Sequence, residues 1–160
     1  MTDDDIKALH DFEDTAVPTD LASLSQRWLA GAIDYALFGA GLFAGAALGM
    51  GLARLSGSSA VTLMTLGTAM LGALIPSVIS WVLITRDGQS LGKRWVGIRI
   101  VTRGGQPPGF LRGVVLRNWV LQLVDRACGF LFFIDHAAIL LRERRAIHDY
   151  IAGTWVIDPN

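Results

Sequence analysis

The 160-residue sequence has a single cysteine, Cys128, and little charge. One thiol excludes an intrachain disulfide and a metal site built on thiolates. Asp, Glu, Lys and Arg make up 18% of the chain and are absent over long stretches. Residues 61–85 carry no charge, and residues 28–53 carry one, at Asp34. Apolar runs of this length can cross a bilayer, so we expect an all-α integral membrane protein.

The charge that is present is unevenly distributed. Residues 1–20 hold seven acids and one base, which predicts an acidic, flexible cytoplasmic tail. Residues 86–117 hold seven bases and one acid. Because apolar segments of membrane length flank this basic stretch, we interpret it as juxtamembrane rather than as a nucleic-acid-binding surface. Residues 21–160 are expected to form one transmembrane domain. The acidic N-terminus lacks the basic region of a signal peptide.

The hydropathy pattern predicts a bundle of three transmembrane helices. We place the spans at about 28–53, 61–85 and 127–141. Residues 109–141 are too long for one span and carry several charges, so we assign about 110–123 to an interfacial or re-entrant amphipathic helix.

Three glycines recur at four-residue spacing in the first span, at Gly41, Gly45 and Gly49. Small residues at this spacing leave one smooth helix face, which allows close contact with another helix. We predict that these glycines form a packing face.

Two short segments rich in β-branched residues lie at about 96–102 and 154–157. We predict that they pair as two strands at the cytoplasmic surface, because a lone strand would leave its hydrogen bonds unmade. Residues 86–94 are predicted to form a turn. That turn would place Lys93 and Arg94 against lipid headgroups or against Asp149.

Asp34 is a candidate functional residue because it lies inside the first span. A charged side chain at the centre of a membrane helix costs roughly 2.5–3.5 kcal/mol on insertion scales. Arg27 precedes Asp34 by seven residues, close to two helical turns, so both project from nearly the same face. The pair predicts polar contacts inside the bundle.

The basic loop sets the orientation. Short loops rich in Lys and Arg are cytoplasmic, so residues 86–117 and the N-terminus are predicted to lie in the cytoplasm. The basic residues 142–145 would also be cytoplasmic if residues 109–141 enter the membrane and return. With a single span there, the C-terminus would lie outside. Both topologies remain open.

A second acid, Asp135, extends the site prediction. In the hairpin topology Asp34 and Asp135 reach the same depth and could bind a proton or cation. In the three-span topology each acid needs its own partner, for which Arg117 and Arg126 are candidates. Alternatively, these charges form internal salt bridges that fix the helices in register.

Several segments resemble the RDD family of small membrane proteins. They run from Arg27 to Asp34, Gly88 to Arg94 (GQSLGKR), Gly97 to Val101 (GIRIV), Leu116 to Asn118 (LRN), and Arg144 to Thr154 (RRAIHDYIAGT). The family is named for an arginine and two aspartates in its spans. The resemblance implies Arg27, Asp34 and Asp135 as that trio, with Asp125 as the other assignment for the last.

The resemblance also implies a transport-related role, and sodium/proton exchange is proposed for some members. Our first functional hypothesis is therefore that Asp34 and Asp135 bind a proton or cation while Arg27 tunes their pKa, in a homo-oligomer. The alternative is a non-catalytic accessory or assembly subunit that docks on a larger membrane complex through the glycine face. A bacterial cytoplasmic (inner) membrane is the expected location.

The remaining motifs do not predict an enzyme, a cofactor or a metal centre. His148 and Asp149 are adjacent on a helix and point about 100° apart, so they cannot form a catalytic dyad with each other. We interpret them as a helix cap or a surface contact to the basic loop. The GQSLGKR segment lacks the residue order of a phosphate-binding loop.

Overall fold

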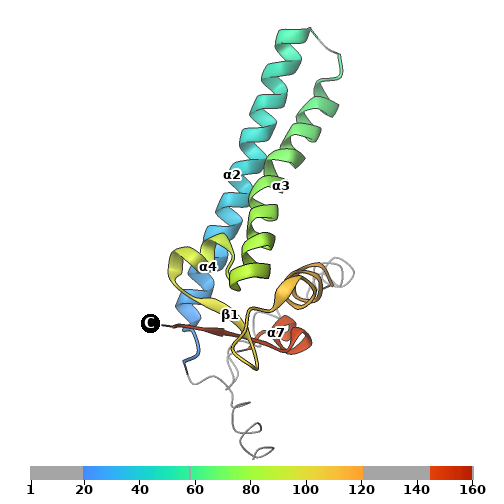
Figure 1. Cartoon of the computed structure of the whole chain (residues 1–160). Helices are drawn as coiled ribbons and strands as arrows, with labels where there is room; N and C mark the ends of the chain where they lie inside the picture. The colour runs from blue at the N-terminus through green and yellow to red at the C-terminus, as the bar shows by residue number, and fades with distance from the viewer. Residues whose placement is uncertain (1–19, 58, 121–144, 160) are drawn as a thin grey trace, which may run out of the picture.

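The computed structural model describes residues 20–57, 59–120 and 145–159. In chain order these residues form helices α2 (Leu24–Ser56), α3 (Val61–Asp87) and α4 (Leu91–Val96), strand β1 (Arg99–Thr102), π-helix η1 (Leu111–Val120), helix α7 (Ile147–Ala152) and strand β2 (Thr154–Ile157). Helices α2 and α3 form a long antiparallel hairpin, and the other elements gather at one end of it (Figure 1). We call this end the base.

Local capping explains where α2 begins and ends. Ser23 is the N-cap, and its hydroxyl accepts a hydrogen bond from the Gln26 backbone N–H at 3.2 Å. The Gln26 side-chain oxygen in turn accepts a hydrogen bond from the Ser23 backbone N–H at 2.8 Å, which completes a capping box. At the other end Gly57 adopts a left-handed conformation (φ +63°) that terminates the helix.

The glycine face of α2 packs against α3. A Cβ atom added to Gly41 would overlap the Gly72 carbonyl, and one added to Gly45 would overlap the Thr68 backbone. At Gly49 the added atom would lie 2.7 Å from the Met64 carbonyl oxygen. The two backbones therefore approach too closely for any side chain at these positions.

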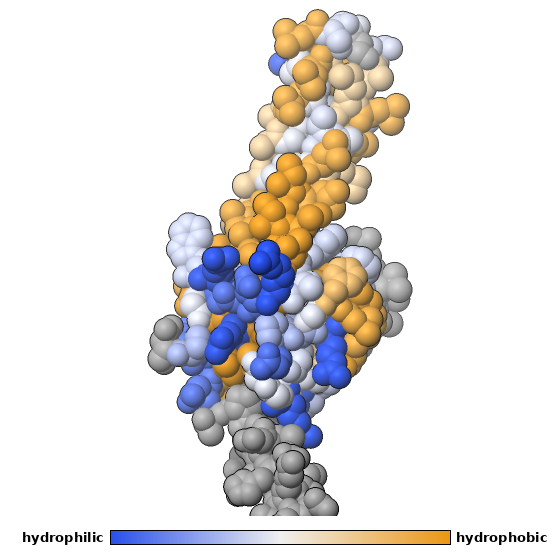
Figure 2. All heavy atoms as spheres, in the orientation of Figure 1, coloured by the Kyte–Doolittle hydropathy of each residue, from blue (hydrophilic) through white to orange (hydrophobic). Residues whose placement is uncertain are grey.

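Both hairpin helices are long and apolar enough to cross a membrane. Their large apolar side chains point outward, and Phe43, Leu63 and Met70 are each more than 70% exposed. Figure 2 shows this apolar surface along the hairpin and hydrophilic side chains gathered at the base. The predicted pair of long apolar helices is thus confirmed, with bounds that extend slightly beyond 28–53 and 61–85.

The predicted strand pairing at the base is also confirmed. Strand β1 runs antiparallel to β2, with Arg99 opposite Ile157 and Thr102 opposite Thr154. Leu21, just before α2, forms a bridge to Ile157 on the same strand. The start of α2 is therefore tied to the end of the chain.

The first strand is shorter than predicted. Strand β1 begins at Arg99 rather than at 96, because residues 91–96 form α4 instead of continuing a turn. Ser90 caps this helix by accepting a hydrogen bond from the Lys93 N–H at 3.3 Å. Gly97 ends it in a left-handed conformation (φ +86°). The cap and the glycine outweigh the β-branched character of Val96.

A small apolar core holds the base to the hairpin. It contains buried residues from both hairpin helices, both strands and η1: Ala22, Ala30, Ile84, Ile98, Ile100, Val114 and Val156. Helix η1 corresponds to the predicted amphipathic helix over about 110–123, although it is a π-helix in the described residues. The predicted third span at 127–141 lies outside the described residues.

Candidate functional site

Asp149 is the centre of a charged network at the base. Its side chain is fully buried, and the side chains of the two arginines that face it are each only 7% exposed. Arg27 Nη1 lies 3.2 Å from Asp149 Oδ2, and Arg117 Nη2 lies 2.9 Å from Asp149 Oδ1. Arg27 also donates to the Val156 carbonyl at 3.1 Å. One carboxylate thereby joins α2, η1 and α7.

The environment of Asp149 stabilises its ionised form. Burial alone would raise the pKa of this carboxyl, but the charges of Arg117, His148 and Arg27 outweigh burial and lower the pKa below its ordinary value. The Ala146 backbone N–H adds a hydrogen bond to the same group at 3.3 Å. Asp149 therefore carries its charge at neutral pH as a partner for two arginines.

Arg145, two residues before α7, adds contacts to this network. Its Nη2 donates to the Asp149 backbone carbonyl at 3.1 Å. The guanidinium lies 4.0 Å from the ring centre of Tyr150 and 4.1 Å from that of Trp155, so it is held by cation–π contacts with both. These contacts fix α7 against β2.

Asp34 makes a separate contact, with the start of α4. Its Oδ2 accepts a hydrogen bond from the Ser90 hydroxyl at 2.5 Å, and its Oδ1 accepts one from the Gly92 N–H at 2.7 Å. The carboxylate thus accepts one free backbone N–H, that of Gly92, at a helix N-terminus, where negative charge is favourable. No ion pair to Asp34 occurs among the described residues.

Gly92 allows this contact because it has no side chain. A Cβ atom at this position would overlap the Ala30 carbonyl and lie 3.0 Å from Asp34 Cγ. Helix α4 therefore rests backbone to backbone on α2, near the end of the hairpin that joins the base (Figure 1).

Lys93 connects the two contacts electrostatically. This half-buried side chain has its pKa lowered to about 8, first by burial and then by the positive charge of Arg117, against the opposing effects of Asp34 and Asp149. Its ammonium group therefore lies within the field of both acids and both network arginines. In the described part of the chain, Lys93 and the two network arginines, Arg27 and Arg117, thus lie near the two carboxylates of Asp34 and Asp149.

The geometry corrects two sequence predictions and decides between the alternatives of a third. Arg27 shares a helix face with Asp34 but pairs with Asp149, so it is not a direct partner of Asp34. Arg117 is likewise paired with Asp149 rather than with Asp34. Of the two alternatives predicted for Asp149, the helix cap is confirmed, because its side chain accepts a hydrogen bond from the Ala146 N–H at the start of α7. Asp149 also contacts Arg117 of the basic stretch, but this contact is buried rather than at the surface.

The other predicted site residues lie either beside this network or outside the described residues. Asp125, Arg126 and Asp135 lie outside the described residues. His148 lies beside the network, with Nε2 3.3 Å from Arg117 Nη2. Sequence analysis did not identify Ser90 and Gly92 as partners of Asp34. Ser90 directly before Leu91 is a typical N-cap residue and could have indicated a helix start with free N–H groups in need of an acceptor.

The model of the RDD family matches residues 21–153, a range that contains Arg27, Asp34 and Asp149. The chain belongs to the RDD family. Family membership and the two long apolar helices together indicate a membrane protein.

This RDD protein also has a relative among curated proteins. An uncharacterized protein of Haemophilus influenzae (strain ATCC 51907 / DSM 11121 / KW20 / Rd) is 27% identical over 151 residues. The alignment covers 92% of this chain and 85% of that protein. No solved structure matches the chain significantly.

Proposed function

We propose that this RDD protein is a transport-related membrane protein that binds a proton at Asp34. The observation that carries the proposal is the environment of that carboxylate. It lies in a membrane-length helix, accepts hydrogen bonds from two neutral donors, and has no ion-pair partner among the described residues. Ionisable residues inside membrane spans typically mark proton and ion pathways.

The atoms around Asp34 favour a proton over a metal cation. Sodium and divalent cations need several oxygen ligands and compensating negative charge. Here the surroundings add one hydroxyl from Ser90, one amide N–H from Gly92 and the nearby positive charge of Lys93. A cation would lose its hydration without gaining a second carboxylate from the described residues.

Protonation of Asp34 would affect the position of α4. The ionised carboxylate accepts both hydrogen bonds, and protonation weakens it as an acceptor and adds a donor of its own. The contact with the start of α4 would then weaken. Lys93 is a suitable exchange partner, because its lowered pKa of about 8 lets it gain and lose a proton near neutral pH.

A pathway for transport must lie outside the α2–α3 interface. That interface is filled by close backbone contacts at Gly41, Gly45 and Gly72. We propose that residues 121–144, which include Asp125 and Asp135, or a second copy of the chain complete the pathway. A homo-oligomer remains our proposal for the assembly.

Exposed arginines support a cytoplasmic base. Five exposed arginines lie at the base: Arg86, Arg94, Arg99, Arg103 and Arg112. In the described residues at the far end of the hairpin, the one basic residue is Arg54. By the positive-inside rule the base and the N-terminus face the cytoplasm of a bacterial inner membrane.

Flux measurements in proteoliposomes test the proposal. An imposed pH gradient should dissipate faster with wild-type protein than in protein-free vesicles, and Asp34→Asn should remove the difference. Asp87→Asn is the matched control, because Asp87 is 46% exposed and lies 3.9 Å from Arg94 in a surface pair. Unchanged flux in Asp34→Asn would overturn the proton-binding role.

The second candidate function is an accessory subunit of a larger membrane complex. It is favoured by the extensive outward apolar surface of the hairpin, which a partner helix could cover as well as lipid. The docking face cannot be the predicted one, since α3 already occupies Gly41, Gly45 and Gly49. Wild-type protein without flux that co-purifies in fixed stoichiometry with a membrane complex would favour this candidate.

A further inference from the structure

An apolar groove lies where α3 reaches the base. It has a volume of about 300 Å³ and is lined by Val78, Trp81, Val82, Thr85, Arg86 and Phe110. The first four residues follow the i, i+3, i+4, i+7 spacing of one helix face. The Thr85 hydroxyl donates to the Trp81 carbonyl at 2.7 Å, so its hydrogen is already used and the lining is apolar apart from Arg86.

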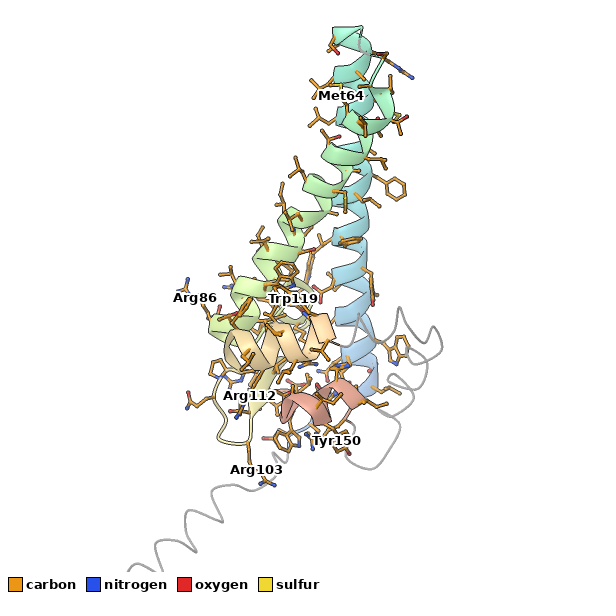
Figure 3. The ribbon with its side chains drawn as sticks, turned by 90° about the vertical axis from the view of Figure 1, so that its right-hand side faces the viewer. Met64, Arg86, Arg103, Arg112, Trp119 and Tyr150 are labelled. Atoms are coloured by element: carbon orange, nitrogen blue, oxygen red, sulfur yellow. The ribbon has the colours of Figure 1, made fainter. Side chains whose placement is uncertain are left out.

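The two aromatic side chains that line this groove, Trp81 and Phe110, both contact a third ring, that of Trp119. Trp119 of η1 contacts Trp81 edge to face at 5.5 Å between ring centres and contacts Phe110 at 5.7 Å. Figure 3 shows η1, with Trp119, crossing the lower end of α3. Tryptophans at the end of a membrane-length helix are typical of the lipid headgroup level. The groove therefore opens where acyl chains meet headgroups.

Positive charge lies at the edge of the groove. Arg86 is exposed and makes no hydrogen bond or ion pair with the described part of the chain, and the same is true of Arg112. Arg86 lies in the last turn of α3, whereas Arg103 follows β1 at the tip of the base, farther from the hairpin (Figure 3). A guanidinium without a protein partner at headgroup level is complementary to a phosphate.

We propose that this groove is a binding site for an anionic phospholipid. One acyl chain lies against Val78, Trp81 and Phe110, and the headgroup phosphate accepts hydrogen bonds from Arg86. The apolar lining selects a chain rather than a soluble anion, and the arginine selects negative headgroups over zwitterionic ones. The site is separate from Asp34 and does not depend on the proposed transport function.

Native mass spectrometry of the full chain in detergent tests this site. The protein is incubated with equimolar phosphatidylglycerol and phosphatidylcholine of identical acyl chains, and retained lipids are counted. We expect preferential retention of phosphatidylglycerol. Arg86→Gln should lower it about fivefold, the factor for ~1 kcal/mol per arginine at an anionic surface, and the control Arg103→Gln should leave it unchanged.

Two further measurements distinguish lipid binding in the groove from general attraction to a basic surface. Phe110→Ala removes one apolar wall and should reduce phosphatidylglycerol retention, although it changes no charge. Soluble glycerol phosphate should not displace the lipid, because it lacks the chain. Equal retention of both lipids, an equal effect of Arg86→Gln and Arg103→Gln, no effect of Phe110→Ala, or displacement by glycerol phosphate would each overturn the proposal.

Discussion

Arg27 and Asp149 form a buried ion pair although 122 positions separate them, with 3.2 Å between Arg27 Nη1 and Asp149 Oδ2. Arg117 holds the other oxygen of the same carboxylate at 2.9 Å. The pair thus joins the first membrane-length helix to an element near the C-terminus. Its first consequence concerns stability, since a buried charge that loses its partner is costly.

We predict that Asp149→Asn destabilises the protein by about 3–5 kcal/mol, the range for breaking a buried ion pair from one side. The amide is close to the carboxylate in size but leaves the buried guanidinium groups of Arg27 and Arg117 without a counter-charge. Thermal unfolding in detergent, followed by circular dichroism, measures the change.

Asp87→Asn provides the comparison for this prediction. Asp87 is exposed and its contact with Arg94 is long, so its loss should cost at most about 1 kcal/mol. Equal stability losses in the two variants would show that the Asp149 network contributes no more than a surface pair.

Lys93 should make stability increase with pH. Its pKa is lowered from 10.5 to about 8 in the folded chain, so between these values the unfolded chain binds more protons. Stability therefore rises as pH increases from 8 to 10.5, and the charged lysine is a cost below pH 8. Lys93→Met should remove this rise and add up to about 3 kcal/mol at pH 7.

The measurement is the unfolding temperature of both proteins across this pH range. Arg94→Met is the control, because Arg94 is its exposed neighbour on α4 and stays charged throughout. A wild-type profile that matches the Lys93→Met profile would contradict the assignment.

Sequence analysis predicted the features that depend on local composition. The two apolar helices follow from uncharged runs of membrane length, and the β1–β2 pair follows from two β-branched segments. Glycine spacing at 41, 45 and 49 indicated a packing face, and these residues do lie against α3. Such features need no knowledge of which distant residues meet.

The partners of the charged residues could not be predicted in the same way. Arg27 and Asp34 share a helix face, but they contact different elements because β2 and α7 approach the first turn of α2 while α4 covers α2 about two turns farther along. That arrangement depends on the tertiary packing around Ile98 and Val156. Periodicity on one helix cannot determine which side chain faces which neighbour.

Gly45→Ala should weaken the hairpin, whereas Gly39→Ala should not. A Cβ at Gly45 overlaps the Thr68 backbone, and one at Gly39 meets nothing within 4 Å. We expect a loss of about 1–3 kcal/mol for Gly45→Ala from overpacking. Gly39→Ala should instead gain about 0.5–1 kcal/mol, since alanine favours the helix. Unfolding in detergent measures both, and the same sign for both variants would contradict the observed interface.

The contact between Asp34 and Gly92 can be tested by combining two substitutions. Gly92→Ala places a Cβ against the Ala30 carbonyl and should push the N–H away from the carboxylate, at a cost of about 2–3 kcal/mol. Gly104→Ala is the control, because its added Cβ meets nothing within 4 Å.

Asp34→Asn removes the charge at the other end of the same hydrogen bond. If both substitutions act by breaking this contact, the stability loss of the double variant should fall short of the sum of the single losses by about 0.5–3 kcal/mol. Additive losses would mean that Asp34 and Gly92 stabilise the protein independently.

Flux in proteoliposomes adds a readout that stability alone does not explain. Because Gly92→Ala keeps the carboxyl group but loosens α4, it should alter proton flux rather than abolish it as Asp34→Asn does.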